Sequence, residues 1–449
     1  MINKNNVKDF ISQNKWLIGI LLACFILSIS YAFYFQITPL VDADAYDTIA
    51  QNIVNGIGYR ENPEVSINSD NALLRVGPIY EYFLAGIYKI FGHSYKAVWI
   101  IQALLRVVST LFLYLTVILI FKDQEKKKKI ALLSAAVFAF YPDLIEISAM
   151  LMSETLYLFF VCLFFYAFFK YLNVQDKKWL WGLGFISSLA VLARPPLLFI
   201  LPVVIFYFLR KKDWKSLFIY GFILIVVFTP WTVRNYSIHK NIIPFGVAGS
   251  ANFWIGNHVG ANGEQETNEE IDTFINTHDM KEINEKSITE FKNYVFNHPA
   301  NFVTLSLSRA NKYFSVLRPM GFWFYSSGWK QALFVLSSAI FSFLVLIFSL
   351  AGIIRAFKLK EKFLYYLLAF TILTPLILFI TVVETRYRFQ IYPLLAVFTS
   401  YFILSLKEKN KEWFKILGLS LAIILVNGVV DGLTNFEHFK EKLLNKWLL

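Results

Sequence analysis

The chain has 449 residues, of which 57% are hydrophobic, 18% aromatic and only 16% charged. Soluble globular proteins carry about 25% charged residues, so this composition excludes a chain whose whole surface faces water. The formal net charge is +12, but the basic residues stand in short clusters between apolar runs, which indicates orientation in a membrane and no nucleic-acid partner. Because Cys24 and Cys162 both lie inside apolar runs, we expect neither a disulfide framework nor a zinc cluster.

Eleven apolar runs are candidates for spanning helices, since crossing the hydrocarbon core takes about 20 mainly apolar residues. The first, Trp16–Phe35, continues well past Cys24, so it is too long for the apolar part of a signal peptide and is expected to be retained. The other runs are 97–121, 130–145, 149–172, 179–193, 195–209, 217–230, 331–354, 363–383, 389–406 and 413–430. The sequence therefore predicts an all-α polytopic membrane protein, in which short runs such as 130–145 are half-helices or closely coupled pairs.

The clusters of Lys and Arg predict the orientation. If the N-terminus is cytoplasmic, each cluster falls in a cytoplasmic loop, as the preference of basic residues for that side requires; the clusters are 122–129, 177–178, 210–215, 355–362 and 407–415. Residues 1–430 then form one membrane domain, with residues 431–449 as an external tail. Two longer polar segments, about 36–96 and 231–330, are also expected outside.

Both external segments are expected to carry helices that lie along the membrane surface. In the first, the stretch Pro78–Phe91 is too short and too aromatic to span, and suits an interfacial helix. The second has a Gly- and Asn-rich part, 246–263, then an acidic helical stretch, and then residues 291–314, which are apolar at helical spacing.

Three carboxylates follow the first span directly, at Asp42, Asp44 and Asp47. They are compatible with a solvated loop or with the start of a helix, where Asp is favoured. The functional alternative is a paired-carboxylate site. One of Asp42 and Asp44 would accept a proton from a hydroxyl group, and the other would hold a divalent cation or a sugar hydroxyl. The D-x-D pattern alone does not decide between these interpretations.

Further motifs along the chain give the acidic pattern a context. In chain order they are Arg75-Val76-Gly77-Pro78-Ile79-Tyr80, Ser153-Glu154-Thr155-Leu156-Tyr157, Ala193-Arg194-Pro195, Pro230-Trp231-Thr232-Val233-Arg234-Asn235, Gly256-Asn257-His258, Asn297-His298-Pro299-Ala300-Asn301-Phe302 and Arg386-Tyr387-Arg388. With the acidic motif, they resemble the GT-C superfamily of membrane glycosyltransferases over about residues 36–400. The likeness is closest to family 39, the dolichyl-phosphate-mannose–protein mannosyltransferase type, with its bacterial relatives of the lipid A aminoarabinose transferase type.

The resemblance implies a GT-C fold and a reaction with a lipid-linked sugar. Members of the superfamily transfer a monosaccharide from a polyprenyl phosphate to a lipid, glycan or protein acceptor, inverting it in a single displacement. The expected place is the extracytoplasmic face of a bacterial-type cell membrane. Asp42 would be the general base, since it precedes Tyr46 by four residues as in the D-x-x-x-Y pattern of the family. Ala43 replaces one acidic residue of the usual pair, so the division of labour between Asp42 and Asp44, and a metal ion at Asp44, stay open.

A polyprenyl phosphate needs fixed positive charge at the outer interface, and arginine suits it because two parallel N–H groups can bind one phosphate. Six arginines map to outer helix ends or external segments, with snorkelling as the alternative explanation: Arg75, Arg194, Arg234, Arg318, Arg386 and Arg388. The same motifs offer substrate contacts at Tyr46, Tyr80, Glu154, Asn257 and His258. Glu154 could instead make a helix contact, and His258 could be an ordinary loop residue. Arg106 lies inside the second span, and its role is open.

A lipid or glycan transporter is the competing interpretation, because it would have as many spans. Transporters concentrate ionisable residues near the membrane midplane on interrupted helices, often in repeated halves. Here the candidates gather at outer helix ends, and the two halves are unlike each other. We therefore expect a glycosyltransferase that works among membrane lipids on a polyprenyl-phosphate-linked donor, with a divalent metal ion as the one cofactor considered.

Overall fold

The computed structural model describes residues 4–440 except Val76, Lys122, residues 319–327, Glu361 and His438. Within these residues the chain consists of helices joined by turns and contains no strand, as the apolar pattern predicts. Part of the second external segment, 319–327, and most of the expected tail, 441–449, lie outside the described residues. The elements are α1 (Lys4–Phe35), α2 (Asp42–Val54), η1 (Asn71–Leu74), α3 (Pro78–Phe91), α4 (Tyr95–Ile120), α5 (Gln124–Ala139), α6 (Pro142–Ser148), α7 (Ser153–Val174), α8 (Lys177–Ala193), η2 (Pro195–Ile200), α9 (Leu201–Lys211), α10 (Trp214–His239), α11 (Ala248–Gly256), α12 (Glu269–Thr277), α13 (Met280–Asn297), α14 (Pro299–Phe314), α15 (Gly328–Leu359), α16 (Lys362–Leu373), α17 (Leu376–Ile380), η4 (Thr385–Ile391), α18 (Tyr392–Ser405), η5 (Leu406–Glu408) and α19 (Lys411–Thr434).

Eight helices in the described part of the chain are long and apolar enough to cross a membrane. They are Asn14–Phe35, Tyr95–Ile120, Ser153–Val174, Trp214–His239, Gly328–Leu359, Phe363–Ile380, Arg386–Glu408 and Lys411–Thr434. A ninth crossing results if α5 and α6, bent by 55° at their junction, count as one span. Each predicted apolar run is mostly helical. However, α8 has only 17 residues, and the run 195–209 is divided between η2 and α9. The number of eleven spans therefore stays a prediction, whereas the polytopic all-α architecture is confirmed.

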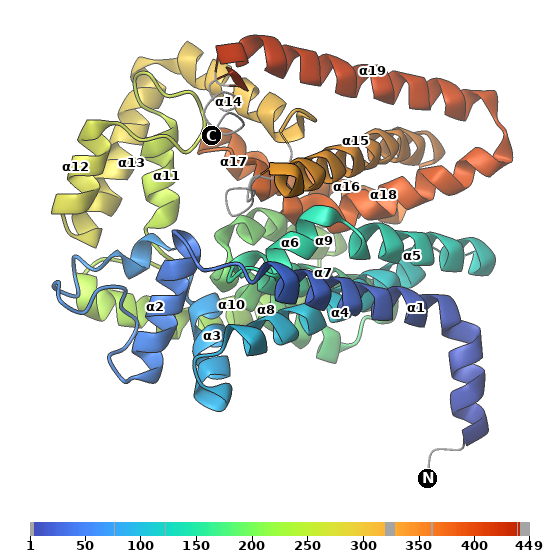
Figure 1. The fold of residues 1–449 in the computed structure, drawn as a ribbon, viewed down its shortest axis with the longest axis horizontal. Coiled ribbons are helices and arrows are strands. Elements are labelled where there is room, and N and C mark those ends of the chain that lie inside the picture. The colour runs from blue at the N-terminus through green and yellow to red at the C-terminus, as the bar shows by residue number, and fades with distance from the viewer. Residues whose placement is uncertain are drawn as a thin grey trace.

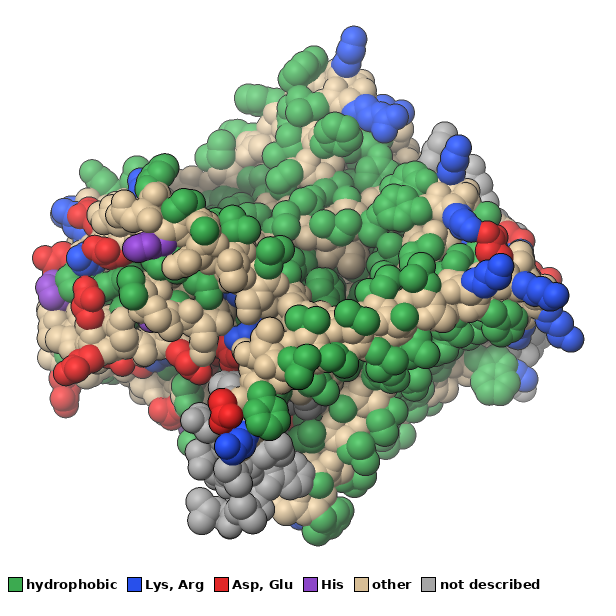
Figure 2. Space-filling view, turned by 90° about the horizontal axis from the view of Figure 1, so that it is seen from above, with side chains coloured by type: hydrophobic (Ala, Val, Ile, Leu, Met, Phe, Trp, Pro, Cys, Tyr) green, Lys and Arg blue, Asp and Glu red, His purple; other side chains and the backbone are tan. Residues whose placement is uncertain are grey.

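Figure 1 shows the long helices running side by side, with α4 against α7, α15 against α18 and α8 against α10. Most helices of the two expected external segments, namely α2, α3 and α11 to α13, gather at one end of this bundle, on the left of the picture. Figure 2 shows that Asp and Glu side chains are concentrated over this end, while Lys and Arg predominate at the opposite end. The two long segments that are expected to be external and the basic loops therefore lie at opposite ends of the bundle.

Helix α10 runs past the end expected for its span. The apolar run stops at Pro230, but the helix continues to His239 with this proline in its interior. The indole of Trp231 donates a hydrogen bond to the carbonyl of Phe245 at 2.5 Å. This contact folds the following segment back along the helix, which stabilises the last turns beyond the proline.

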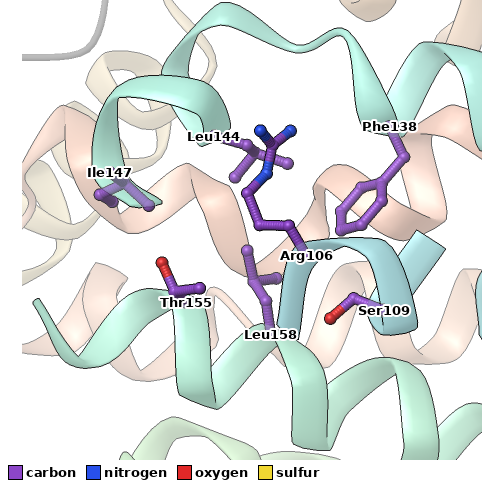
Figure 3. A pocket seen from close by; sticks show the side chains of 7 residues that line it. All are labelled: Arg106, Ser109, Phe138, Leu144, Ile147, Thr155 and Leu158. Carbon is purple, nitrogen blue, oxygen red and sulfur yellow. The ribbon is translucent and has the colours of Figure 1, made fainter. Parts of the chain in front are cut away.

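Arg106 lies beside the break between α5 and α6. Its terminal nitrogens donate to Ser28 Oγ and to the carbonyl oxygen of Ala139, both at 2.7 Å. Figure 3 shows its side chain against a cavity of about 10 Å³, room for about one water molecule, whose wall includes Phe138 and Leu144. The last carbonyls of a helix have no partner within it. Arg106 satisfies one of them at the end of α5, which explains a charged side chain at this depth.

Candidate functional site

Asp42 opens helix α2 directly after a strained turn. The preceding Val41 has φ 54° and ψ −114°, and its side chain is 78% exposed. Positive φ is unfavourable for a β-branched residue, and strain of this kind clusters at functional sites. Asp42 and Asp44 both lie in the first turn of the helix, where the free N–H groups favour carboxylates. Asp42 is half-buried, while Asp44 is exposed.

Two arginines from distant parts of the chain flank the Asp42 carboxylate. Arg386 in η4 is 3.1 Å from Asp42 Oδ2, and Arg75, between η1 and α3, is 3.5 Å from Oδ1. Each guanidinium also has a second carboxylate, Glu384 for Arg386 and Glu61 for Arg75, both at 2.5 Å. The side chain of Asp42 is 28% exposed and that of Arg386 is 16% exposed. The cluster therefore offers one carboxylate and two cations at a place that solvent reaches.

A buried ion pair, Arg194 with Glu154, lies within electrostatic range of Arg386. Arg194 Nη1 is 2.8 Å from Glu154 Oε1, and both side chains are almost fully buried. The rings of Tyr387 and Phe389 lie 5.7 and 5.3 Å from the guanidinium. The partner of Glu154, which its sequence motif did not indicate, is therefore Arg194. The structure brings these two predicted site residues into direct contact.

Tyr46 and Tyr80 pack edge to face, with ring centroids 5.3 Å apart, and both are buried. Burial, and then the negative charge of Asp42, raise the pKa of Tyr46 well above its ordinary value. Its phenol therefore stays protonated beside the carboxylate. Tyr80 donates a hydrogen bond to Gln102 of α4 at 3.0 Å. The structure brings Tyr46 to the Asp42 cluster and ties Tyr80 to the neighbouring helix.

Three of the six predicted arginines have partners that hold segments together. Arg318 forms a two-point pair with Asp431 at the end of α19, at 2.8 and 3.0 Å. Arg388 donates to the carbonyl of Arg318, and Arg234 donates to the carbonyl of Tyr59 at 3.0 Å. A role for these three in binding phosphate stays a prediction, and their contacts favour a framework role.

Asn257 and His258 follow α11 in the second external segment. The Asn257 amide donates to the carbonyl of Ile380 at 2.9 Å, and its oxygen accepts from Arg309 at 3.1 Å. His258 Nδ1 lies 2.9 Å from the carbonyl oxygen of Ile255. These contacts close the turn after α11 against α14 and α17, and a substrate contact for either residue stays a prediction.

The absence of a side chain at Gly77 allows the turn that contains Arg75 to pack closely against the end of α8. A Cβ atom at this position would lie 2.1 Å from the carbonyl oxygen of Leu192, two residues before Arg194. Gly77→Ala must therefore push these two segments apart, and we expect it to destabilise the protein by about 1–3 kcal/mol, as overpacking usually does. Thermal unfolding in detergent measures the effect. Gly86→Ala in α3 is the matched control, because its Cβ would meet no atom within 4 Å; equal unfolding temperatures for both variants would show that the close approach at Gly77 is dispensable.

Comparison with known proteins bears on this arrangement. Residues 75–233 match the sequence model of the family described as dolichyl-phosphate-mannose-protein mannosyltransferase, whereas no curated protein matches the chain. The archaeal oligosaccharyltransferase AglB from Archaeoglobus fulgidus, in complex with an inhibitory peptide and a dolichol-phosphate, is similar in structure, with a TM-score of 0.51 and 14% identity over 93% of this chain and 55% of that one. ArnT from Cupriavidus metallidurans bound to undecaprenyl phosphate has a TM-score of 0.49 and 12% identity over 94% of this chain and 64% of that one.

The likeness to AglB decides the architecture. The chain has the GT-C fold. It spans less than two thirds of the length of either solved chain, so the likeness concerns the part that they share. Within the GT-C fold of this chain, the residues that meet at Asp42 come from α2, from the turn before α3 and from η4.

The residues of this candidate site do not fit a resident metal ion. Hard divalent cations need carboxylate oxygens that are free to coordinate them. Asp42 directs both of its oxygens at guanidinium groups, and Asp44 is exposed on the helix surface. Among the residues that the structure describes, no three His, Cys, Asp or Glu side chains form a group that could hold a metal. The role of Asp44 as a metal ligand stays a prediction.

Two carboxylates of the cluster, Glu61 and Glu384, were not predicted from the sequence. Glu384 stands two residues before Arg386, so its distance from a predicted motif could have drawn attention to it. Glu61 lies in the irregular segment between α2 and η1, where no local pattern signals its contact with Arg75. Both residues neutralise the arginines that flank Asp42.

Asp47 and Glu81 are buried carboxylates near the same site. Asp47 accepts hydrogen bonds from the phenols of Tyr88 and Tyr95 at 2.5 and 2.8 Å, which ties α2 to α3 and to the start of α4. Glu81 is fully buried in α3, and burial raises its pKa to about 8. It is therefore mostly protonated at neutral pH. The sequence signal for Glu81 was its place directly after the motif that ends at Tyr80.

Proposed function

We propose that this protein is a membrane glycosyltransferase that moves a monosaccharide from a polyprenyl-phosphate-linked donor to an acceptor on the extracytoplasmic face. The reaction is an inverting single displacement with Asp42 as the general base. The observation that carries this proposal is the Asp42 carboxylate between two partly exposed guanidinium groups, those of Arg75 and Arg386. The dolichol-phosphate bound to AglB supports a lipid-linked phosphate as the class of donor.

The proposed sugar transfer is a single displacement in which Asp42 accepts the proton. A hydroxyl group of the acceptor donates a hydrogen bond to Asp42, and its oxygen attacks the anomeric carbon of the sugar. The bond between that carbon and the phosphate oxygen breaks, the proton passes to Asp42, and the electron pair leaves with the polyprenyl phosphate. Fixed guanidinium groups stabilise the charge that develops on the leaving phosphate. Attack and departure on opposite faces of the sugar invert the anomeric centre.

Arg386 is the arginine best suited to the leaving phosphate. Its guanidinium contacts Asp42 and Glu384, and it remains partly exposed. A bound phosphate competes with Asp42 for this guanidinium. When the phosphate takes the place of the carboxylate, Asp42 becomes free to accept the proton, so donor binding and activation of the base are coupled.

The extracytoplasmic location is supported by the distribution of charge. The Asp42 cluster belongs to the end of the bundle that carries the external segments, and Lys and Arg predominate at the other end. Basic loops are retained on the cytoplasmic side of membranes. The same argument favours a cytoplasmic N-terminus.

The experiment supplies the purified protein with radiolabelled polyprenyl-phosphate sugars and follows donor dependence in wild type and Arg386 variants. Hydrogen bonds to charged groups contribute about 1.5–3 kcal/mol, so Arg386→Ala should raise the donor KM by about 10–100-fold. Arg386→Lys should recover part of this, because lysine keeps the charge but cannot make the two-point contact. Arg210→Ala, at the exposed end of α9, is the control and should behave as wild type.

The outcomes separate the proposal from its rivals. An unchanged donor KM in Arg386→Ala would remove this residue from phosphate binding. If the wild type forms no labelled product from any polyprenyl-phosphate sugar, yet moves lipid or glycan across vesicle membranes, the protein is a transporter.

A further inference from the structure

Glu61 holds the guanidinium of Arg75 at two points. Glu61 Oε2 is 2.9 Å from Arg75 Nε, and Oε1 is 2.5 Å from Nη2, a geometry typical of a strong charge-assisted pair. The remaining nitrogen, Nη1, lies 3.5 Å from Asp42 Oδ1, which is at the limit of a hydrogen bond. Burial lowers the pKa of Arg75, but the pair with Glu61 outweighs it and leaves the pKa above its ordinary value. Arg75 is therefore bound firmly to Glu61 and loosely to Asp42.

Separate contacts fix the backbone around Glu61. The buried carboxylate of Asp70 accepts from the backbone N–H groups of Glu61 and of the next residue, both at 2.9 Å. Asn52 of α2 donates to the carbonyl of the preceding residue at 2.8 Å, and Arg234 of α10 donates to that of Tyr59 at 3.0 Å. Contacts from three parts of the chain thus converge on a stretch of four residues. They hold Glu61 in place beside Arg75 although the segment has no regular secondary structure.

We propose that Glu61 is a positioning residue for Asp42 and acts through Arg75. By holding two nitrogens of Arg75, it prevents this guanidinium from turning its two-point face onto Asp42. A carboxylate in a two-point pair with arginine is a poor proton acceptor, because the pair favours the charged form. Glu61 thus keeps Asp42 available for the proton of the acceptor hydroxyl. This inference rests on the proposed function, since it takes Asp42 as the base.

Among the charged and titratable groups around Asp42, Arg75 is the one that controls its charge during the proposed reaction. Arg386 faces Asp42 from η4 at 3.1 Å, and Tyr46 and Tyr387 lie within electrostatic range of it. In the proposed reaction Arg386 turns to the donor phosphate. Arg75 is then the cation that remains beside Asp42. The strength of its ion pair with Asp42 depends on how firmly Glu61 holds the guanidinium.

The test compares the pH dependence of sugar transfer in Glu61→Gln and Glu64→Gln, each in the full-length protein in detergent. Glu64 is exposed on the same segment, which makes it the matched control. In Glu61→Gln, Arg75 is free to pair with Asp42, which then keeps its charge to lower pH and accepts a proton less readily. We expect the acid limb of kcat to move down by about one pH unit and the plateau to fall by about tenfold. Glu64→Gln should match the wild type.

A double variant separates positioning from folding. Arg75→Gln removes the group through which Glu61 acts, so adding Glu61→Gln to it should lower transfer only slightly further. Losses that multiply in the double variant, or an acid limb that stays in place in Glu61→Gln, would overturn the inference. Failure of the proposed function looks different, because the wild type would then transfer no sugar. If only the inference fails, wild-type transfer and its loss in Asp42→Asn both remain.

Discussion

Asp42→Asn is expected to lower the turnover of sugar transfer by about 10²–10⁴-fold, the usual contribution of a general base. The amide keeps the size of the carboxylate, and its one oxygen can still accept a hydrogen bond from one of the two arginines. It cannot take up the proton of the acceptor hydroxyl. The ion pairs of Asp42 are partly exposed, so losing them should change stability little. The measurement is kcat at saturating donor, with unfolding temperature as a check on the fold.

Asp44→Asn is the matched control for this prediction. Asp44 lies in the same helical turn as Asp42 but is exposed, so its replacement should lower turnover far less. A folded Asp42→Asn protein that works at the wild-type rate would show that the base lies elsewhere. Equal losses in the two variants would contradict the assignment of proton transfer to Asp42 alone.

Arg194→Ala should lower the free energy of unfolding by about 3–5 kcal/mol, because it leaves a buried charge without its partner. This loss is larger than the one expected for Gly77→Ala. The unpaired charge is the carboxylate of Glu154, which is 0% exposed and 2.8 Å from the guanidinium. The loss should appear as a lower unfolding temperature in detergent. Adding Glu154→Gln removes the unpaired charge and should recover part of the stability.

The matched control for the buried pair of Arg194 and Glu154 is an exposed ion pair. Lys129 pairs with Glu125 one helical turn away, and both side chains are largely exposed. Lys129→Ala should therefore leave the unfolding temperature nearly unchanged. If the double variant of Arg194 and Glu154 recovers nothing, the contribution of Arg194 lies in its contacts with the rings of Tyr387 and Phe389 and not in its charge.

Local sequence was sufficient for the helices because a bilayer constrains local composition. The interval expected for an interfacial helix, Pro78–Phe91, has the bounds of α3, and the run 97–121 lies almost entirely within α4. The run 130–145 was expected to be a half-helix or a coupled pair, and it is broken near Tyr141. Local composition could not predict that Arg106 covers the free carbonyl there. Such a contact joins helices that are separate in the sequence.

The same limit applies to the candidate site. Arg386 and Arg388 stand two residues apart in one motif, yet the first contacts the Asp42 carboxylate and the second a backbone carbonyl. Side-chain type and position at a helix end are alike for both, so the sequence had no means to separate them. Glu61 could not be predicted because it belongs to no motif. Its proposed importance comes entirely from the Arg75 guanidinium that it holds.

The pair of Asp42 and Arg386 also has a consequence for biosynthesis. The two residues are 344 positions apart in the chain, so a ribosome completes nearly all the other long helices before Arg386 exists. A growing chain therefore carries Asp42, the proposed general base, but not the guanidinium proposed to bind the donor phosphate. During this interval a water molecule beside Asp42 has no held sugar phosphate to attack. Under the proposed function, this order of synthesis would protect the lipid-linked donor from hydrolysis by unfinished copies of the protein.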